Sequence, residues 1–275
     1  MLTGYSNTIS VTTLAPSLLL DLYPSAAAAY SVRKLRTAYT GSAIRVRRSS
    51  DNTEQDIGFS DGNLDTTSLT SFCGAGNGFV TTWYDQSGNG INVTQTTASN
   101  QPQIVSSGSV LLVNGKPAIF SLNKRLLNAS QPNINSPVSD FYAYKVDSFS
   151  TTENYQTFYD GASTETNRGY FGYQKSNGFI IIYDSAIVNG YVGTLNQQLA
   201  TNVRNGANSQ MYKNNVYQAG GNSGSYNPFI GLIFGQDYGG GAPSNVYHQE
   251  FIRYSGVSSN ISAINTNINT YYGIY

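Results

Sequence analysis

The segment Trp83-Tyr-Asp-Gln-Ser-Gly-Asn-Gly90 is the most distinctive stretch of this sequence. A strand pattern, Phe79–Tyr84, leads into it, and Asp85 and Ser87 are residue types that hydrogen-bond to the backbone of a tight turn. Gly88 and Gly90 permit the positive φ values that such a turn requires. The segment therefore predicts a corner at the end of a strand. We interpret it as a structural motif made of Tyr84, Asp85, Gln86, Ser87, Gly88, Asn89 and Gly90.

Strand patterns continue on both sides of this corner, almost to the end of the chain. Short runs rich in aromatic and β-branched residues alternate with Gly, Asn, Asp and Pro, which is typical of a β-sandwich. Phe179–Tyr183 has no polar alternation, so we expect a central strand that is covered on both faces. The other predicted strands are Ala43–Arg48, Val110–Val113, Ala118–Leu122, Phe141–Val146, Tyr155–Tyr159, Gly169–Gln174, Gln198–Arg204, Gln210–Lys213, Phe229–Phe234 and Val246–Tyr254.

Two helices are predicted, one near each end of the chain. Ser25–Arg36 contains four alanines, which favour a helix, and begins with a serine that can cap it. Ser259–Tyr272 places Ile261, Ile264 and Ile268 on one stripe, with Ser258 or Ser259 as its cap.

The remaining chain organisation is simple. Residues 1–20 are predicted to be an extended arm. No repeat or low-complexity linker divides residues 21–275, so we expect them to form a single domain.

Charge excludes several classes of partner. Only 11% of the residues are charged, and the 15 basic and 15 acidic residues cancel, so we expect no binding to nucleic acid or to a membrane surface. A basic stretch is followed at once by an acidic one, and we expect these charges to neutralise each other across neighbouring strands. The alternatives are a local phosphate- or nucleic-acid-binding patch in the basic stretch and a Ca²⁺ site in the acidic stretch. We predict no other cofactor or metal. The basic residues are Arg33, Lys34, Arg36, Arg45, Arg47 and Arg48, and the acidic ones are Asp51, Glu54, Asp56, Asp61 and Asp65.

The single cysteine and the single histidine are not expected to be catalytic. Cys73 cannot form an internal disulfide, so we predict a buried thiol. His248 lies in a predicted strand between Tyr247 and Gln249, which favours a surface or half-buried position.

The corner motif resembles the YDQSGNGN motif of the catalytic domain of α-L-arabinofuranosidase B. Phe72-Cys73 before it, Thr94-Gln95 after it and the stretch Ile230–Asp237 are also similar, and the resemblance extends over residues 21–275. It implies a concanavalin A-like jelly-roll β-sandwich and a retaining glycosidase, which needs two carboxylates. Asp237 falls where the family has its general acid. The family nucleophile is a Glu after a buried strand. Here that place holds Asp184, one or two positions off, and the family's adjacent cysteine pair is absent.

Because that Glu is missing, our main expectation is a non-catalytic surface or structural protein. We expect a phage virion component, such as a head fibre, decoration protein or tail adhesin, located on the virion or outside a cell. It would be a homo-oligomer that contacts other virion proteins and binds a glycan through Tyr183, Tyr226, Asp237 and Tyr238.

Two other functions remain open. One is a retaining α-L-arabinofuranosidase-type hydrolase that uses Asp237 and Asp184. The other is a structural lattice or fibre protein without a ligand.

Overall fold

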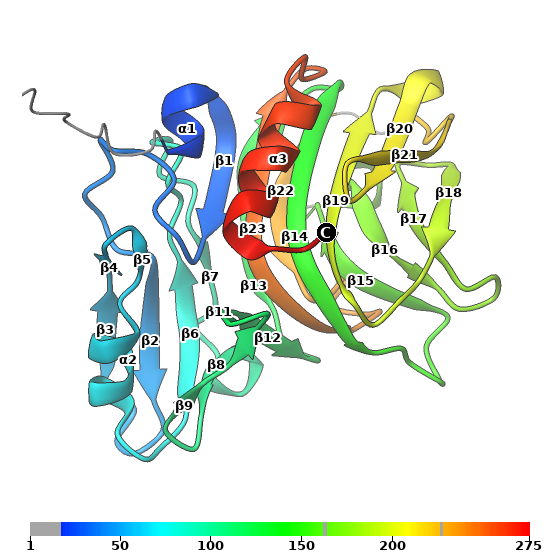
Figure 1. The fold of residues 1–275 in the computed structure, drawn as a ribbon. Helices are drawn as coiled ribbons and strands as arrows, with labels where there is room; N and C mark the ends of the chain where they lie inside the picture. The colour runs from blue at the N-terminus through cyan, green and yellow to red at the C-terminus, as the bar shows by residue number, and fades with distance from the viewer. Residues whose placement is uncertain (1–17, 162–163, 226–227) are drawn as a thin grey trace, which may run out of the picture.

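Antiparallel pairing organises the strands into two facing layers (Figure 1). The structure is a computed structural model and describes residues 18–161, 164–225 and 228–275. The first layer runs β1 (Ala26–Ser31), β23 (Asn245–Ser255), β14 (Val138–Ser148), β19 (Gln197–Arg204), β20 (Ser209–Lys213) and β21 (Val216–Gly221), with β12 (Ile119–Leu122) also on β23. The second runs β13 (Leu126–Ile134), β22 (Phe229–Phe234), β15 (Tyr155–Asp160), β16 (Tyr170–Gln174), β17 (Phe179–Tyr183) and β18 (Ile187–Val192).

The N-terminal third adds a smaller group of strands that joins both layers. Its centre is β6 (Gly78–Trp83), which reaches the first layer through β8 (Gln103–Ser106) and the second through β7 (Val93–Thr94). The remaining elements are β2 (Ile44–Arg48), β3 (Glu54–Ile57), β4 (Phe59–Ser60), β5 (Asn63–Leu64), β9 (Ser109–Val110), β10 (Leu112–Val113), β11 (Lys116–Pro117), α1 (Leu19–Leu22), α2 (Thr66–Cys73), α3 (Ile261–Tyr272), and the 3-10 turns η1 (Ala98–Asn100), η2 (Glu165–Asn167) and η3 (Gly206–Asn208).

Aromatic rings fill the space between the two layers. The ring of Tyr144 lies 5.2 Å from that of Phe158, and the ring of Phe234 lies 5.2 Å from that of Phe251. All four side chains are almost completely buried. These contacts join β14 to β15 and β22 to β23, so the layers share one core. The prediction of an all-β, jelly-roll-like sandwich is confirmed.

The predicted helix Ser25–Arg36 is wrong, because most of its first half forms strand β1. Ala28 and Ala29 are fully buried and pair with β23, and the Asp85 carboxylate accepts a hydrogen bond from the Ala29 amide at 2.9 Å. Ser25 has a φ of 68°, which is a turn conformation and not that of a helix cap. The small alanine side chains let β1 lie close against the core, and tertiary contacts outweigh helix propensity.

The corner motif fastens β1 to the rest of the sheet. The Asp85 carboxylate accepts hydrogen bonds from the backbone amides of Ala29, Ser87 and Ile91 and from the Ser87 hydroxyl. The Gln86 side chain is fully buried. It bonds to backbone groups of Ser31 at the end of β1 and of Arg33 and Leu35 just after it. These contacts explain why an acid and an amide follow one another at this turn.

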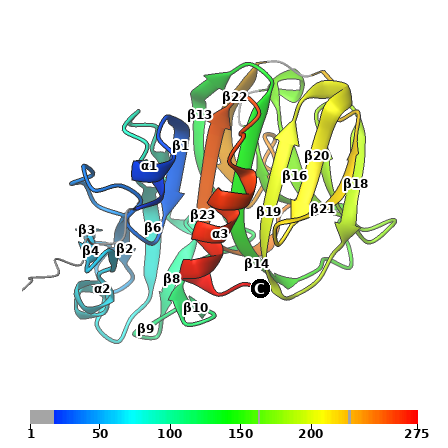
Figure 2. The same cartoon turned by 45° about the horizontal axis from the view of Figure 1, so that its top comes forward.

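The predicted C-terminal helix is present as α3. Figures 1 and 2 show it along the outer face of the layer that contains β23, β14 and β19. Ile264 and Ile268 are buried, and the Asn265 side chain accepts a hydrogen bond from Thr201 of β19 at 2.8 Å. The expected serine cap is wrong, because Asn260 occupies the cap position and makes no side-chain capping bond.

The other sequence expectations have mixed outcomes. Every predicted strand from Phe79 onward is present. Phe179–Tyr183 and Phe229–Phe234 have the expected bounds, Val110–Val113 is divided between β9 and β10, and the others have shifted ends. Residues 1–17 of the expected arm lie outside the described residues, whereas Leu19 and Leu20 are buried in α1. Cys73 is buried. Among the described helices, none is long and apolar enough to span a membrane.

The basic and acidic stretches neutralise each other in part. Arg45 lies 2.7 Å from Glu54 and 3.2 Å from Asp56 across β2 and β3, and Arg48 lies 2.6 Å from Asp51. Arg33 is different, because it forms a buried pair with Glu250 of β23 at 2.7 Å.

Candidate functional site

A cavity of about 290 Å³ opens on the outward face of β15–β18. Tyr170, Ile181, Tyr183 and Ile187 line it from the strands, where Tyr183 pairs with both Tyr170 and Ile187. Tyr155 also lines it from β15. The loop before β16 contributes Glu165 and Arg168, and the loop between β22 and β23 contributes Asp237 and Ala242.

The floor of the cavity depends on Gly172. The Tyr170 hydroxyl donates a hydrogen bond to the Gln156 carbonyl at 3.0 Å, which lays its ring across the sheet. A Cβ at position 172 would lie 2.1 Å from that carbonyl oxygen and 2.4 Å from the Tyr170 hydroxyl. Only glycine leaves room for this arrangement, so the glycine creates the flat aromatic floor.

Arg168 holds the tyrosines of the cavity in place. Its guanidinium lies 2.6 Å from Asp160 at the end of β15. The same guanidinium lies over three rings, 4.8 Å from Tyr238, 5.4 Å from Tyr170 and 5.8 Å from Tyr183, within the range of cation–π attraction. Burial raises the pKa of Asp160 to about 6, although the Arg168 charge opposes this shift. The Arg168–Asp160 ion pair therefore fixes the guanidinium against the tyrosine rings of the cavity.

Two carboxylates, Asp237 and Glu165, line the same cavity. Asp237 closes a tight loop, because its carboxylate accepts a hydrogen bond from the Gly241 amide at 2.7 Å and its own amide donates to the Gly241 carbonyl at 3.1 Å. The Tyr238 hydroxyl donates to Glu165 at 3.2 Å. Carboxylates beside aromatic faces are what a protein needs to bind a sugar and to move a proton at its glycosidic oxygen.

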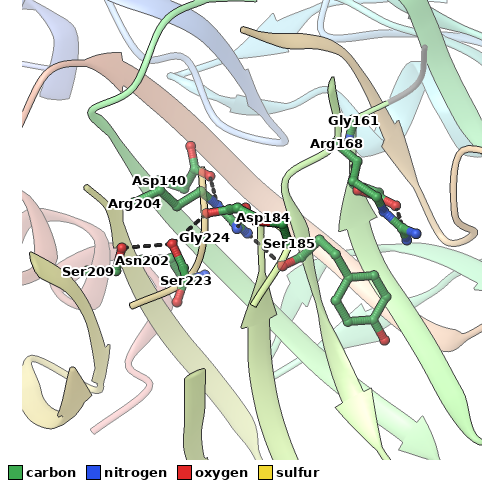
Figure 3. Close-up of polar contacts among 12 residues, drawn as sticks. Asp140, Gly161, Arg168, Asp184, Ser185, Asn202, Arg204, Ser209, Ser223 and Gly224 are labelled. Carbon is green, nitrogen blue, oxygen red and sulfur yellow. Dashed lines mark hydrogen bonds and ion pairs between the residues drawn. The ribbon is translucent and has the colours of Figure 1, made fainter. Parts of the chain in front are cut away.

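Asp184 lies behind the cavity, although its neighbour Tyr183 lines it. Side chains alternate along a strand, so Tyr183 of β17 faces outward and Asp184 faces inward. Asp184 lies 2.5 Å from Arg204 and accepts a hydrogen bond from the Ser223 hydroxyl at 2.7 Å (Figure 3). Arg204 also lies 3.6 Å from Asp140, which is bonded to Arg253. Burial raises the pKa of Asp184. Asp237 therefore lines the cavity, whereas Asp184 does not.

Of the two other tyrosines expected in the site, one contacts residues of the cavity and one cannot be placed. Tyr238 contacts two residues of the cavity lining, because its hydroxyl donates to Glu165 and its ring lies under the Arg168 guanidinium. Tyr226 lies outside the described residues. The sequence does not single out Glu165 and Arg168, because they lie in a Thr- and Asn-rich loop without a strand or motif pattern. The pattern that could identify them is an acidic and a basic residue just before the predicted strand Gly169–Gln174, which contains two tyrosines.

The surface or half-buried position expected for His248 is wrong. The side chain is fully buried, with its ring nitrogens hydrogen-bonded to Tyr142 at 2.5 Å and to Ser121 at 2.7 Å. Burial lowers its pKa to about 3, which keeps the imidazole neutral. Over the described ranges, no three His, Cys, Asp or Glu side chains gather into a metal-binding group.

The N-terminal third of the chain matches a known protein family. Residues 21–110 match the family described as "Alpha-L-arabinofuranosidase B, catalytic". This match includes the corner motif, and it confirms the resemblance inferred from the sequence. It ends before the cavity residues, so Glu165, Arg168 and Asp237 lie outside the matched range.

Solved structures agree with the family match. A mutant GH54 α-L-arabinofuranosidase soaked with 4-nitrophenyl α-L-arabinofuranoside is 18% identical, with a TM-score of 0.70. An arabinofuranosidase complexed with arabinofuranosyl-alpha-1,2-xylobiose is also 18% identical, with a TM-score of 0.68. Each similarity covers 91% of this chain but 63% of the other, so this chain spans less than two thirds of those proteins. At this identity the similarity establishes the fold. No curated protein matches the sequence.

Proposed function

We propose that this protein is a glycoside hydrolase that acts on glycans carrying α-L-arabinofuranosyl groups. The observation that supports this most directly is that Asp237 and Glu165 line one tyrosine-walled cavity on an arabinofuranosidase-like fold. Asp237 comes from the loop after β22, where the related family has its general acid. The solved relatives were studied with arabinofuranosides, which gives the substrate class to test first.

In the proposed reaction the two carboxylates take separate roles. Asp237 gives its proton to the glycosidic oxygen as the bond to the leaving group breaks, and the Glu165 carboxylate bonds to the anomeric carbon. Ionised Asp237 then removes a proton from water, and that water displaces Glu165 and releases the sugar with its configuration retained. The Tyr238 hydroxyl, which donates to Glu165, keeps that carboxylate oriented. Arg168 holds the surrounding rings without entering the reaction.

Hydrolysis of 4-nitrophenyl α-L-arabinofuranoside tests this function. We expect turnover by the unchanged protein and a loss of at least about 100-fold in Asp237→Asn and in Glu165→Gln, since a proton donor and a nucleophile are removed. Asp147→Asn is the matched control, because Asp147 is exposed and lies outside the cavity lining. Absence of turnover in the unchanged protein, or full activity in either cavity variant, contradicts the proposal.

A second candidate is a glycan-binding surface protein without hydrolytic activity, such as the virion component expected from the sequence. The buried pairing of Asp184 with Arg204 favours it, because the carboxylate that follows β17 is not free to attack a sugar. Binding of an arabinofuranose-bearing glycan with no turnover, together with an oligomeric native mass, supports this candidate. Turnover that depends on Asp237 rules it out.

A further inference from the structure

A row of side chains continues from the cavity across the outward face of β15–β18. Tyr155 pairs with Gln174, Gln174 pairs with Phe179, and Phe179 pairs with Val192. These four residues, one from each strand, form the outer row. Tyr155 belongs both to the outer row and to the cavity lining.

The outer row faces away from the core. Ile180 and Tyr191, which alternate with Phe179 and Val192 along their strands, are buried in the core between the layers. Side chains alternate along a strand, so Phe179 and Val192 face the other way. Val192 is 61% exposed and Tyr155 is 39% exposed. An apolar and aromatic surface is therefore open to solvent beside the cavity.

Ordered amides border this surface. The Gln174 amide donates to the Tyr155 hydroxyl at 3.2 Å. The Asn177 amide donates to the side-chain oxygens of Gln174 at 2.9 Å and of Asn189 at 3.0 Å. None of these side chains is charged, and their mutual bonds fix the direction in which each amide presents its groups. Apolar faces bordered by fixed amides suit a neutral sugar chain, which offers C–H faces and hydroxyls.

The strand spacing sets the length of ligand that could use both surfaces. Tyr183 in the cavity and Phe179 in the outer row lie four residues apart on β17. At the usual rise per residue they are about 13 Å apart along the strand. A single sugar cannot reach from one to the other, whereas an oligosaccharide or polysaccharide can.

We propose that the outer row binds the chain of a neutral polysaccharide while one of its sugars occupies the cavity. This proposal rests on the proposed function for the identity of the sugar in the cavity. It adds a second binding surface outside the cavity, where apolar and amide groups of β15–β18 hold the polymer chain.

Binding of a polymer and turnover of a small substrate, measured on the same variants, test the proposal. The probes are a soluble arabinoxylan and 4-nitrophenyl α-L-arabinofuranoside. We expect Phe179→Ala and Val192→Glu to weaken arabinoxylan binding about tenfold, with turnover of the small substrate within about twofold of normal. Val216→Glu is the matched control, because Val216 is also 61% exposed but lies on β21, and it should change neither quantity.

Each outcome separates the two proposals. If Val192→Glu and Phe179→Ala bind arabinoxylan as the unchanged protein does, or if the unchanged protein does not bind it, the outer row has no such role. If the polymer binds and the variants weaken it, the outer row is supported even when the small substrate is not hydrolysed. Absence of hydrolysis then counts against the proposed function alone. Circular dichroism of each variant confirms that it is folded.

Discussion

Replacing Asp184 with Asn tests whether this residue is structural or catalytic. Asn keeps the size of the side chain and can still accept a hydrogen bond from Ser223, but it removes the negative charge beside Arg204. Arg204 is fully buried, and its other carboxylate, Asp140, lies at 3.6 Å and is already bonded to Arg253. Removing one partner of a buried ion pair costs about 3–5 kcal/mol, because the remaining charge stays buried and uncompensated.

This loss is large compared with the stability of a folded protein, which is about 5–15 kcal/mol. We expect the midpoint of guanidinium unfolding, followed by tryptophan fluorescence at pH 7, to fall clearly in Asp184→Asn. Asp51→Asn removes a carboxylate from an exposed pair with Arg48 and should leave the midpoint nearly unchanged. Turnover per folded molecule should also persist in Asp184→Asn. An unchanged midpoint with abolished turnover refutes the structural role and identifies Asp184 as the working carboxylate.

Three further predictions concern stability. Gly172→Ala should destabilise the protein by about 1–3 kcal/mol in urea unfolding, because the added Cβ meets the Gln156 carbonyl, whereas Gly58→Ala, with nothing within 4 Å, should not. Asp160 has a raised pKa, so its stabilising contribution is present below about pH 4 and is lost as the pH rises through about 6. The free energy of unfolding should therefore fall relative to that of Asp160→Asn as the pH rises from about 4 through 6, and parallel pH profiles contradict this. Asp85→Ala should cost more than about 2 kcal/mol in the same unfolding assay, because it leaves buried backbone donors unpaired, and a neutral result contradicts the role of the corner.

The strands were predictable because each one carries its own local pattern. Phe179–Tyr183 and Phe229–Phe234 are runs of large apolar residues, and both are strands with the expected bounds. Ala26–Ser31 has no such pattern, since alanine favours a helix locally and becomes a strand residue only when a partner and a close-fitting core are supplied. The partner strand is distant in sequence, so local propensity could not reveal it.

The site was predictable in part for the same reason. Strands with a clear apolar pattern end at or shortly before three of the site residues, Tyr183, Asp237 and Tyr238. These three could therefore be predicted from the sequence. Glu165 and Arg168 come from a loop, where position depends on which other loop lies opposite. Asp184 also follows a strand. Its inward direction depends on the register of β17, and a change of one residue in that register would reverse it.

The pairing of β1 with β23 has a consequence for protein synthesis. Ser31 of β1 is hydrogen-bonded to Glu250 of β23, and the two are 219 positions apart. At translation rates of about 5–20 residues per second, the ribosome needs about 10–40 s between making one and making the other. During that interval the alanine-rich segment has left the ribosome without its partner strand, and its helix propensity is unopposed. We expect the nascent chain to carry a transient helix there, which converts to a strand when β23 emerges and makes folding slow.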